Sequence, residues 1–101
     1  MFEQAYRYRF AARVDLRDAG DTLLLAVLAA EGLYGTARVR MDLAVATDEA
    51  LRVIVVDAST DVGQAVNGIF AAFLSREFGP DAFSVERVEG VAGGNRQEGG
   101  R

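Results

Sequence analysis

Apolar and polar residues alternate along the first part of the chain. In residues 4–16 every second position from Tyr6 to Leu16 is apolar, and arginines fill several of the positions between them. A period of two with aromatic side chains predicts a strand that has one buried face. Residues 36–46 predict a second strand in the same way. Residues 51–56, which are apolar on both faces, indicate a central strand that forms a hairpin with it.

Two other segments are typical of helices. Residues 22–32 consist of strong helix formers that are apolar on nearly every side, and Gly32 is placed to end a helix there. Such a helix is expected to be covered on more than one face. Residues 60–78 predict a second helix, which Gly79 and Pro80 end. Its core stripe is expected to consist of Val62, Val66, Ile69 and Phe73.

A last short strand over residues 82–88 completes the order strand, helix, strand, strand, helix, strand. This order predicts an α/β (α+β) fold, the ferredoxin-like βαββαβ sandwich, in which two helices cover one face of a four-stranded antiparallel sheet. A chain of 101 residues is expected to form one domain. We place this domain at residues 1–88 and expect residues 89–101 to form a flexible, Gly-rich tail.

The composition excludes most catalytic chemistry. The chain has no His, Cys, Trp or Lys, and all 11 of its basic residues are Arg. Without imidazole, thiol or amine side chains, the usual general bases, several covalent nucleophiles and the softer metal ligands are missing. We therefore predict no enzyme, no catalytic residues, no metal and no cofactor.

Neither a signal-peptide pattern nor an apolar run of about 20 residues occurs, so we expect a cytoplasmic protein that does not bind membranes.

The sequence Asp-Ala-Ser-Thr-Asp at residues 57–61 follows the predicted central strand. An acid at the end of an apolar strand is found in phosphate sites, but a Walker-type site requires a lysine. Ser59 or Thr60 instead suits the N-cap of the following helix, and Asp61 is favourable near the positive helix end. We predict a capped helix start, with anion binding at this position as the alternative.

Arginines are the main candidates for partner binding. If the aromatic residues of the first strand face the helices, the arginines of the first two strands project from the open face of the sheet. The predicted partner-binding set on this face is Arg7, Arg9, Arg13, Arg38, Arg40 and Arg52. Guanidinium groups suit an acidic protein partner, RNA or a phosphate ligand; the alternative is a solvated face. The net charge of −4 disfavours nucleic acid.

A flank of the second predicted helix is a candidate oligomer interface. It is apolar and is rotated away from the expected core stripe, and small residues on it allow close approach of a partner. The alternative is that it rests on the first helix within one monomer. The predicted interface set is Gly63, Asn67, Phe70, Leu74 and Phe78.

Two families resemble parts of the chain. Residues 23–69 resemble the small Pcc1 subunit of the KEOPS complex, in which a stretch like DASTDVGQAVNGIF opens the second helix, with Ala65, Val66 and Asn67 as its Ala-Val-Asn. This resemblance implies a dimerisation and scaffold subunit, although the final strand and the Arg-rich first strand depart from it. The segment RVDLRDAGDTLLLAVLAAEGLYG is similar to the opening of an ACT domain, which implies small-molecule regulation at a dimer interface. The turn at Gly20 lacks the proline usual in that family.

The sequence thus predicts a non-catalytic protein–protein interaction or assembly module, either a homodimer or a subunit of a larger complex. The first alternative is an ACT-like regulatory module that binds a small ligand. The second is RNA or phosphate binding through the arginines of the sheet.

Overall fold

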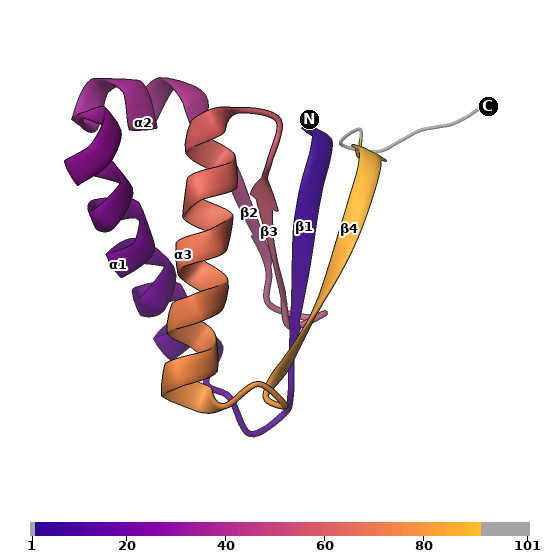
Figure 1. Cartoon of the computed structure of the whole chain (residues 1–101). Coiled ribbons are helices and arrows are strands. Elements are labelled where there is room, and N and C mark those ends of the chain that lie inside the picture. The colour runs from indigo at the N-terminus through magenta and orange to yellow at the C-terminus, as the bar shows by residue number, and fades with distance from the viewer. Residues whose placement is uncertain (1, 92–101) are drawn as a thin grey trace.

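The computed structural model describes residues 2–91, in which four strands form one sheet and helices cover one face of it (Figure 1). The elements are, in chain order, β1 (Phe2–Phe10), α1 (Leu16–Tyr34), α2 (Thr36–Asp42), β2 (Val45–Asp48), β3 (Val53–Asp57), α3 (Asp61–Phe78) and β4 (Phe83–Val91). The sheet is antiparallel, with the strand order β2-β3-β1-β4. The predicted α/β class with a four-stranded antiparallel sheet is confirmed. The succession of elements differs from the predicted one in that a third helix, α2, precedes β2.

Helix α2 takes most of the segment that was expected to be the second strand. Gly35 ends α1 with a φ of 87°, a conformation that favours glycine, and the chain re-enters a helix at Thr36. Of the apolar residues that alternate here, Val39 is buried, whereas Met41 remains 82% exposed. The alternation therefore does not correspond to a buried sheet face, and only residues from Val45 onward pair with β3.

Helix α1 is longer than predicted at both ends. The Asp15 side chain accepts a hydrogen bond from the backbone amide of Arg17 at 2.9 Å and begins the helix at Leu16. The first strand accordingly ends at Phe10 and not at Leu16, although Val14 in the following loop is still buried. At the other end Gly32 lies inside the helix.

At the end of the chain, β4 continues to Val91, and residues 92–101 of the predicted tail lie outside the described residues.

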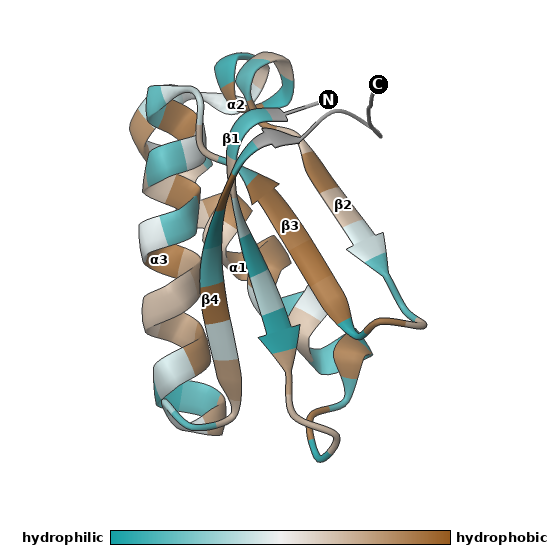
Figure 2. Ribbon diagram, turned by 90° about the vertical axis from the view of Figure 1, so that its right-hand side faces the viewer, coloured by the Kyte–Doolittle hydropathy of each residue, from teal (hydrophilic) through white to brown (hydrophobic). Residues whose placement is uncertain are grey.

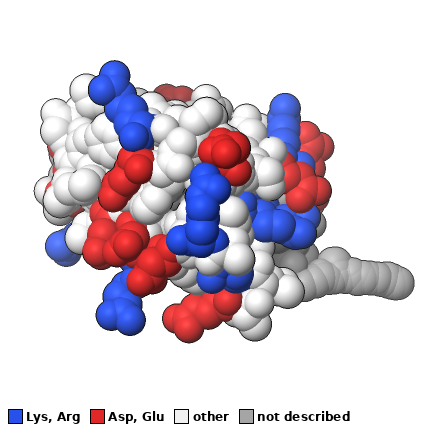
Figure 3. All heavy atoms as spheres, turned by 90° about the horizontal axis from the view of Figure 1, so that it is seen from below, with Lys and Arg blue, Asp and Glu red and all other residues white. Residues whose placement is uncertain are grey.

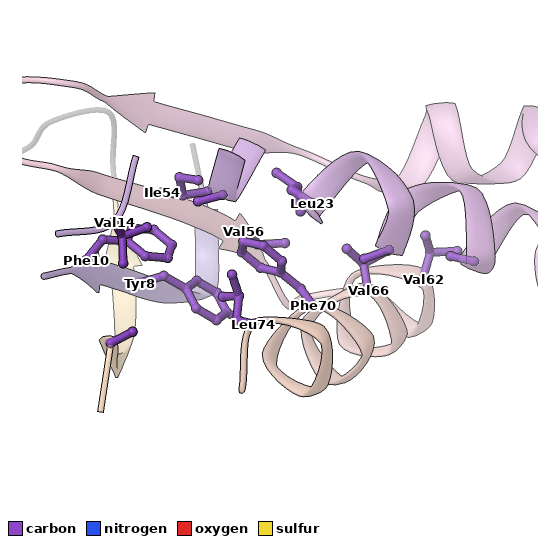
Figure 4. Close-up of a cluster of buried hydrophobic side chains, with 14 of the residues drawn as sticks. Tyr8, Phe10, Val14, Leu23, Ile54, Val56, Val62, Val66, Phe70 and Leu74 are labelled. Atoms are coloured by element: carbon purple, nitrogen blue, oxygen red, sulfur yellow. The ribbon is translucent and has the colours of Figure 1, made fainter. Parts of the chain in front are cut away.

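The core lies between the sheet and α3. Tyr8 is opposite Ile54 in the β1–β3 register, and both side chains are buried on the helix side, as the predicted register requires. Strand β3 is hydrophobic along almost its whole length, which fits its central position (Figure 2). The ring of Phe70 on α3 lies 4.7 Å from the ring of Tyr8. Figure 4 shows these residues in one apolar cluster, to which α3 contributes Val62, Val66, Phe70 and Leu74.

Helix α3 starts in close contact with the end of β3. The hydroxyl oxygen of Thr60 accepts a hydrogen bond from the backbone amide of Gly63, and the hydroxyl donates to the carbonyl of Asp42 on α2, both at 2.9 Å. Thr60 is therefore the N-cap of α3. It is one of the two residues, Ser59 and Thr60, that were predicted for this position. A Cβ atom on Gly63 would lie 2.3 Å from the backbone oxygen of Asp57, so only glycine fits at this position.

Replacing Gly63 with alanine should destabilise the fold by about 2 kcal/mol or more, because the backbone of Asp57 would have to move. Gly68→Ala on the same helix is the matched control. Nothing lies within 4 Å of a Cβ atom at Gly68, so this variant should be more stable than the original chain by about 0.5–1 kcal/mol. Urea unfolding followed by circular dichroism measures both changes. Two variants of equal stability would contradict the close contact at Gly63.

Candidate functional site

Asn67 is the centre of a buried polar network beneath α3. Its Oδ1 accepts a hydrogen bond of 2.6 Å from the Tyr8 hydroxyl, and its Nδ2 donates to the carbonyl oxygens of Gly63 at 2.8 Å and Asp57 at 3.2 Å. The Ser59 hydroxyl lies 2.8 and 2.9 Å from the two carboxylate oxygens of the buried Asp57. These polar groups bind one another, so the network holds β1, β3 and α3 together.

The Tyr8 hydroxyl gives this network a measurable pH dependence. Burial raises the pKa of Tyr8 far above its usual value, and the nearby Tyr6 adds to the shift. A raised pKa in the folded state means that the stabilisation is complete below the unfolded pKa of about 10 and is lost as the pH rises above it.

The Tyr8→Phe variant should therefore lose about 1 kcal/mol of unfolding free energy at neutral pH, because Asn67 loses its donor. Above about pH 10 its unfolding free energy should fall less steeply than that of the original chain. Urea unfolding across this pH range tests both statements. Tyr34→Phe, at a half-buried tyrosine outside the network, is the control and should retain the steep fall. Parallel curves for the Tyr8 variant and the original chain would contradict the role of Tyr8.

The six predicted partner-binding arginines do not share one surface. Arg7 and Arg9 lie on the open face of β1, whereas Arg38 and Arg40 lie on α2, Arg13 in the loop after β1, and Arg52 in the β2–β3 turn. The predicted arginine face of the sheet is therefore wrong, because residues 36–42 are helical and β1 ends at Phe10. Acidic and basic side chains are interspersed on the face drawn in Figure 3. Three of the six arginines form ion pairs: Arg7–Glu86 at 2.7 Å, Arg13–Asp81 at 3.1 Å and Arg38–Asp42 at 3.5 Å.

The Arg7–Glu86 pair on the open face of the sheet can be measured directly. The hydrogen bond and the charge of Arg7 lower the pKa of the Glu86 carboxyl, and Arg9 adds a smaller contribution of the same sign. Arg7→Gln should return this pKa toward its usual value, and Arg9→Gln should move it much less. An NMR pH titration of the Glu86 side chain measures both changes. A larger shift in the Arg9 variant would show that the pair is not formed in solution.

The predicted interface flank on α3 does not lie on the surface. Phe70 and Leu74 are fully buried, and Gly63 and Asn67 are used in the contacts with β3 described above. Phe78 is half-buried against the same core. The prediction of an exposed interface at these residues is wrong, because α3 turns this flank toward the sheet. Ile69 and Phe73, which were expected in the core, are only partly buried.

Helix α1 has small residues inside and large residues outside. Its buried positions are Ala19, Thr22, Leu23, Ala26 and Ala30. Its large exposed residues are Leu24 at 56% exposure, Leu25 at 55%, Leu28 at 51% and Leu33 at 70%. Leu24, Leu25 and Leu28 lie within about 100° around the helix axis and form what we call the leucine face, whereas Leu33, seven residues after the buried Ala26, is exposed at the end of the helix on the other side. Ala29 and Gly32 are also exposed, and no charged residue occurs between Asp21 and Glu31. One side of this helix is therefore an apolar surface that the monomer leaves uncovered.

A notch between α1 and α3 extends the leucine face. It has a volume of about 290 Å³ and is lined by Thr22, Leu25, Phe73, Arg76 and Glu77. The Thr22 hydroxyl donates to the Glu77 carboxylate at 2.8 Å and so joins the two helices at this point. The all-apolar pattern of residues 22–32 predicted a helix with more than one covered face, but it did not identify which leucines remain exposed.

A second groove of the described surface is uncharged. This groove of about 430 Å³ between α3 and the β1–β4 side of the sheet is lined by uncharged residues, Gln4, Tyr6, Gln64 and Val85 among them. Within residues 2–91 no three acidic side chains lie close enough together to hold a metal ion. No single described helix is long and apolar enough to cross a membrane; α1 and α2 meet that test only together, across a bend of 119°.

Comparison of the chain with protein-family models, with curated proteins and with solved structures finds no match. The resemblance to Pcc1 and to ACT domains therefore stays a prediction. Function has to be argued from the surface of this molecule alone.

Proposed function

We propose that the chain is a ferredoxin-like domain that acts as a non-catalytic assembly module and forms a homodimer through the leucine face. The single observation behind this proposal is that three leucines on one side of α1 are each more than half exposed while three alanines of the same helix are buried.

The strand order supports the ferredoxin-like assignment. With α2 set aside, the elements follow the order strand, helix, strand, strand, helix, strand. Strands β1 and β3 are central, β2 and β4 form the edges, and α1 and α3 lie together on one side (Figure 1). We interpret this arrangement as a split βαβ fold with one short helix added after α1.

The distribution of side chains on α1 is unfavourable for an isolated monomer. Turning the leucines inward and the alanines outward would remove more apolar surface from water. Monomeric proteins seldom expose large continuous apolar patches, and such patches usually mark an interface. A domain of this size also gains proportionally more from added burial than a larger one. The leucine face is therefore best explained as surface that a partner covers.

A second copy of the chain suits this surface. Helix α1 has 19 residues and is about 28 Å long, enough for two copies to cross along their leucine faces. If the two copies are antiparallel, the end that carries Asp18 and Asp21 approaches the end that carries Arg38 and Arg40. The Arg38 guanidinium lies 5.0 Å from the ring of Tyr34, the last residue of α1, and also pairs with Asp42 within the monomer. Arg40 is exposed and forms no ion pair among the described residues, so it is the positive charge at this end that a partner can use. Such a contact is symmetric, so each notch can receive an apolar side chain of the partner.

Light scattering after gel filtration tests the homodimer. The chain should elute with twice its mass of 10.8 kDa, and Leu28→Glu should shift it toward the monomer. Burying the exposed half of one leucine contributes about 1 kcal/mol, and the residue occurs twice in a symmetric contact, so the dissociation constant should rise at least about 30-fold. Leu51→Glu is the control, because Leu51 is 65% exposed but lies in the β2–β3 turn, outside the leucine face.

Two results would contradict the proposal. The first is a monomeric chain at concentrations of about 0.1 mM, well above the dissociation constants usual for specific complexes. The second is equal dissociation of the Leu28 and Leu51 variants. Binding of the monomer to phosphatidylcholine vesicles through α1 would assign the leucine face to lipid and would also overturn it.

A further inference from the structure

A cavity of about 630 Å³ lies between the loop that joins β1 to α1 and the turn that joins β2 to β3. It contains no residue of the leucine face and has no part in the proposed dimer contact. We call it the arginine cavity, because three guanidinium groups share its lining with two carboxylates. The residues on which the inference depends are Arg13, Arg17, Arg52, Asp15, Glu49 and Thr47.

Arg52 occupies a position that favours glycine. Its φ is 58°, and among the described residues it is the only residue other than glycine with a positive φ. Its Nη2 donates hydrogen bonds to the carbonyl of Ala11 at 2.9 Å and to the carbonyl of Val14. Its Nε is buried without a partner within residues 2–91. An unusual backbone conformation and an unsatisfied buried donor on the same residue are features that concentrate at binding sites.

Of the three arginines, Arg17 is the one whose guanidinium forms neither a hydrogen bond nor an ion pair within residues 2–91, whereas Nη2 of Arg52 is bound to two backbone carbonyls. The Arg17 side chain is exposed. Arg13 pairs with Asp81 at 3.1 Å, outside the cavity lining. Neither Asp15 nor Glu49 forms an ion pair with a described arginine, although both line the same cavity.

We propose that the arginine cavity binds a small oxyanion, a carboxylate or a phosphate monoanion, between the guanidinium groups of Arg17 and Arg52. The planar guanidinium group matches the oxygens of both kinds of anion, and the Thr47 hydroxyl adds a neutral donor. Asp15 and Glu49 repel anions of high charge, so a polyphosphate or a nucleic acid is not the ligand. The bound anion joins the first turn of α1 to the β2–β3 turn.

NMR of the arginine Nε–Hε signals in the full chain tests this site, with sodium phosphate and sodium acetate as probes at an ionic strength held constant by sodium chloride. The Arg17 and Arg52 signals should shift with increasing probe concentration until the shift saturates. The probe with the lower dissociation constant identifies the kind of anion that the site prefers. Arg17→Gln should weaken binding about tenfold or more, since a hydrogen bond between charged groups is lost. Arg87→Gln, at an exposed arginine on the opposite edge strand β4, is the control and should bind normally.

Three outcomes would overturn the site: shifts that chloride reproduces, shifts of similar size in all the arginines, or equal binding by the Arg17 and Arg87 variants. Because Arg17 is exposed, its replacement leaves the fold intact, whereas a change of Arg52 also removes the bonds to Ala11 and Val14. Light scattering measures the dimer independently, so failure of one proposal is distinguishable from failure of the other.

Discussion

The close packing of α1 through its small side chains determines which surfaces this protein has left for partners. Ala19, Ala26 and Ala30 are fully buried, and the hydrogen bond from Thr22 to Glu77 ties α1 to α3. A helix that turns its alanines inward has to turn its larger residues outward. The uncovered leucines are thus a direct consequence of how the two helices approach each other, and they carry the proposed dimer contact.

The junction between β3 and α3 differs from the leucine face, because its polar groups are bound to one another within the monomer. Thr60 caps α3 and also binds the end of α2, while Asn67 links the Tyr8 hydroxyl to two backbone carbonyls. Gly63 lets the helix approach the strand closely enough for these bonds to form. The motif that most resembles a phosphate site in the sequence is therefore structural. The one buried side-chain polar atom without a partner among residues 2–91, Nε of Arg52, lies elsewhere, on a residue that lines the arginine cavity.

Sequence periodicity predicted β3, α3 and residues 4–10 of β1, because in each of these a buried face agrees with the local pattern. It failed at residues 11–16 and 36–42, where apolar residues also alternate but no neighbouring strand is available to pair with them. Two local features determine the structure of these segments. The Asp15 cap begins α1 at Leu16, and the turn at Gly35 leads directly into α2. On α3 the pattern could not distinguish Phe70 and Leu74 from Ile69 and Phe73, because both sides of the helix are equally apolar. The conformation of Arg52 has no sequence signal, since a positive φ usually indicates glycine.

Whether the leucine face is covered by a second copy is measured most directly by isotope-filtered NMR on a mixture of chains with labelled and unlabelled leucine methyl groups. Homodimer formation through α1 predicts intermolecular NOEs between the methyl groups of Leu24, Leu25 and Leu28 of the two copies. Their absence, together with broadening of the same methyl signals by a soluble paramagnetic agent, would show that water covers this face and would contradict the homodimer.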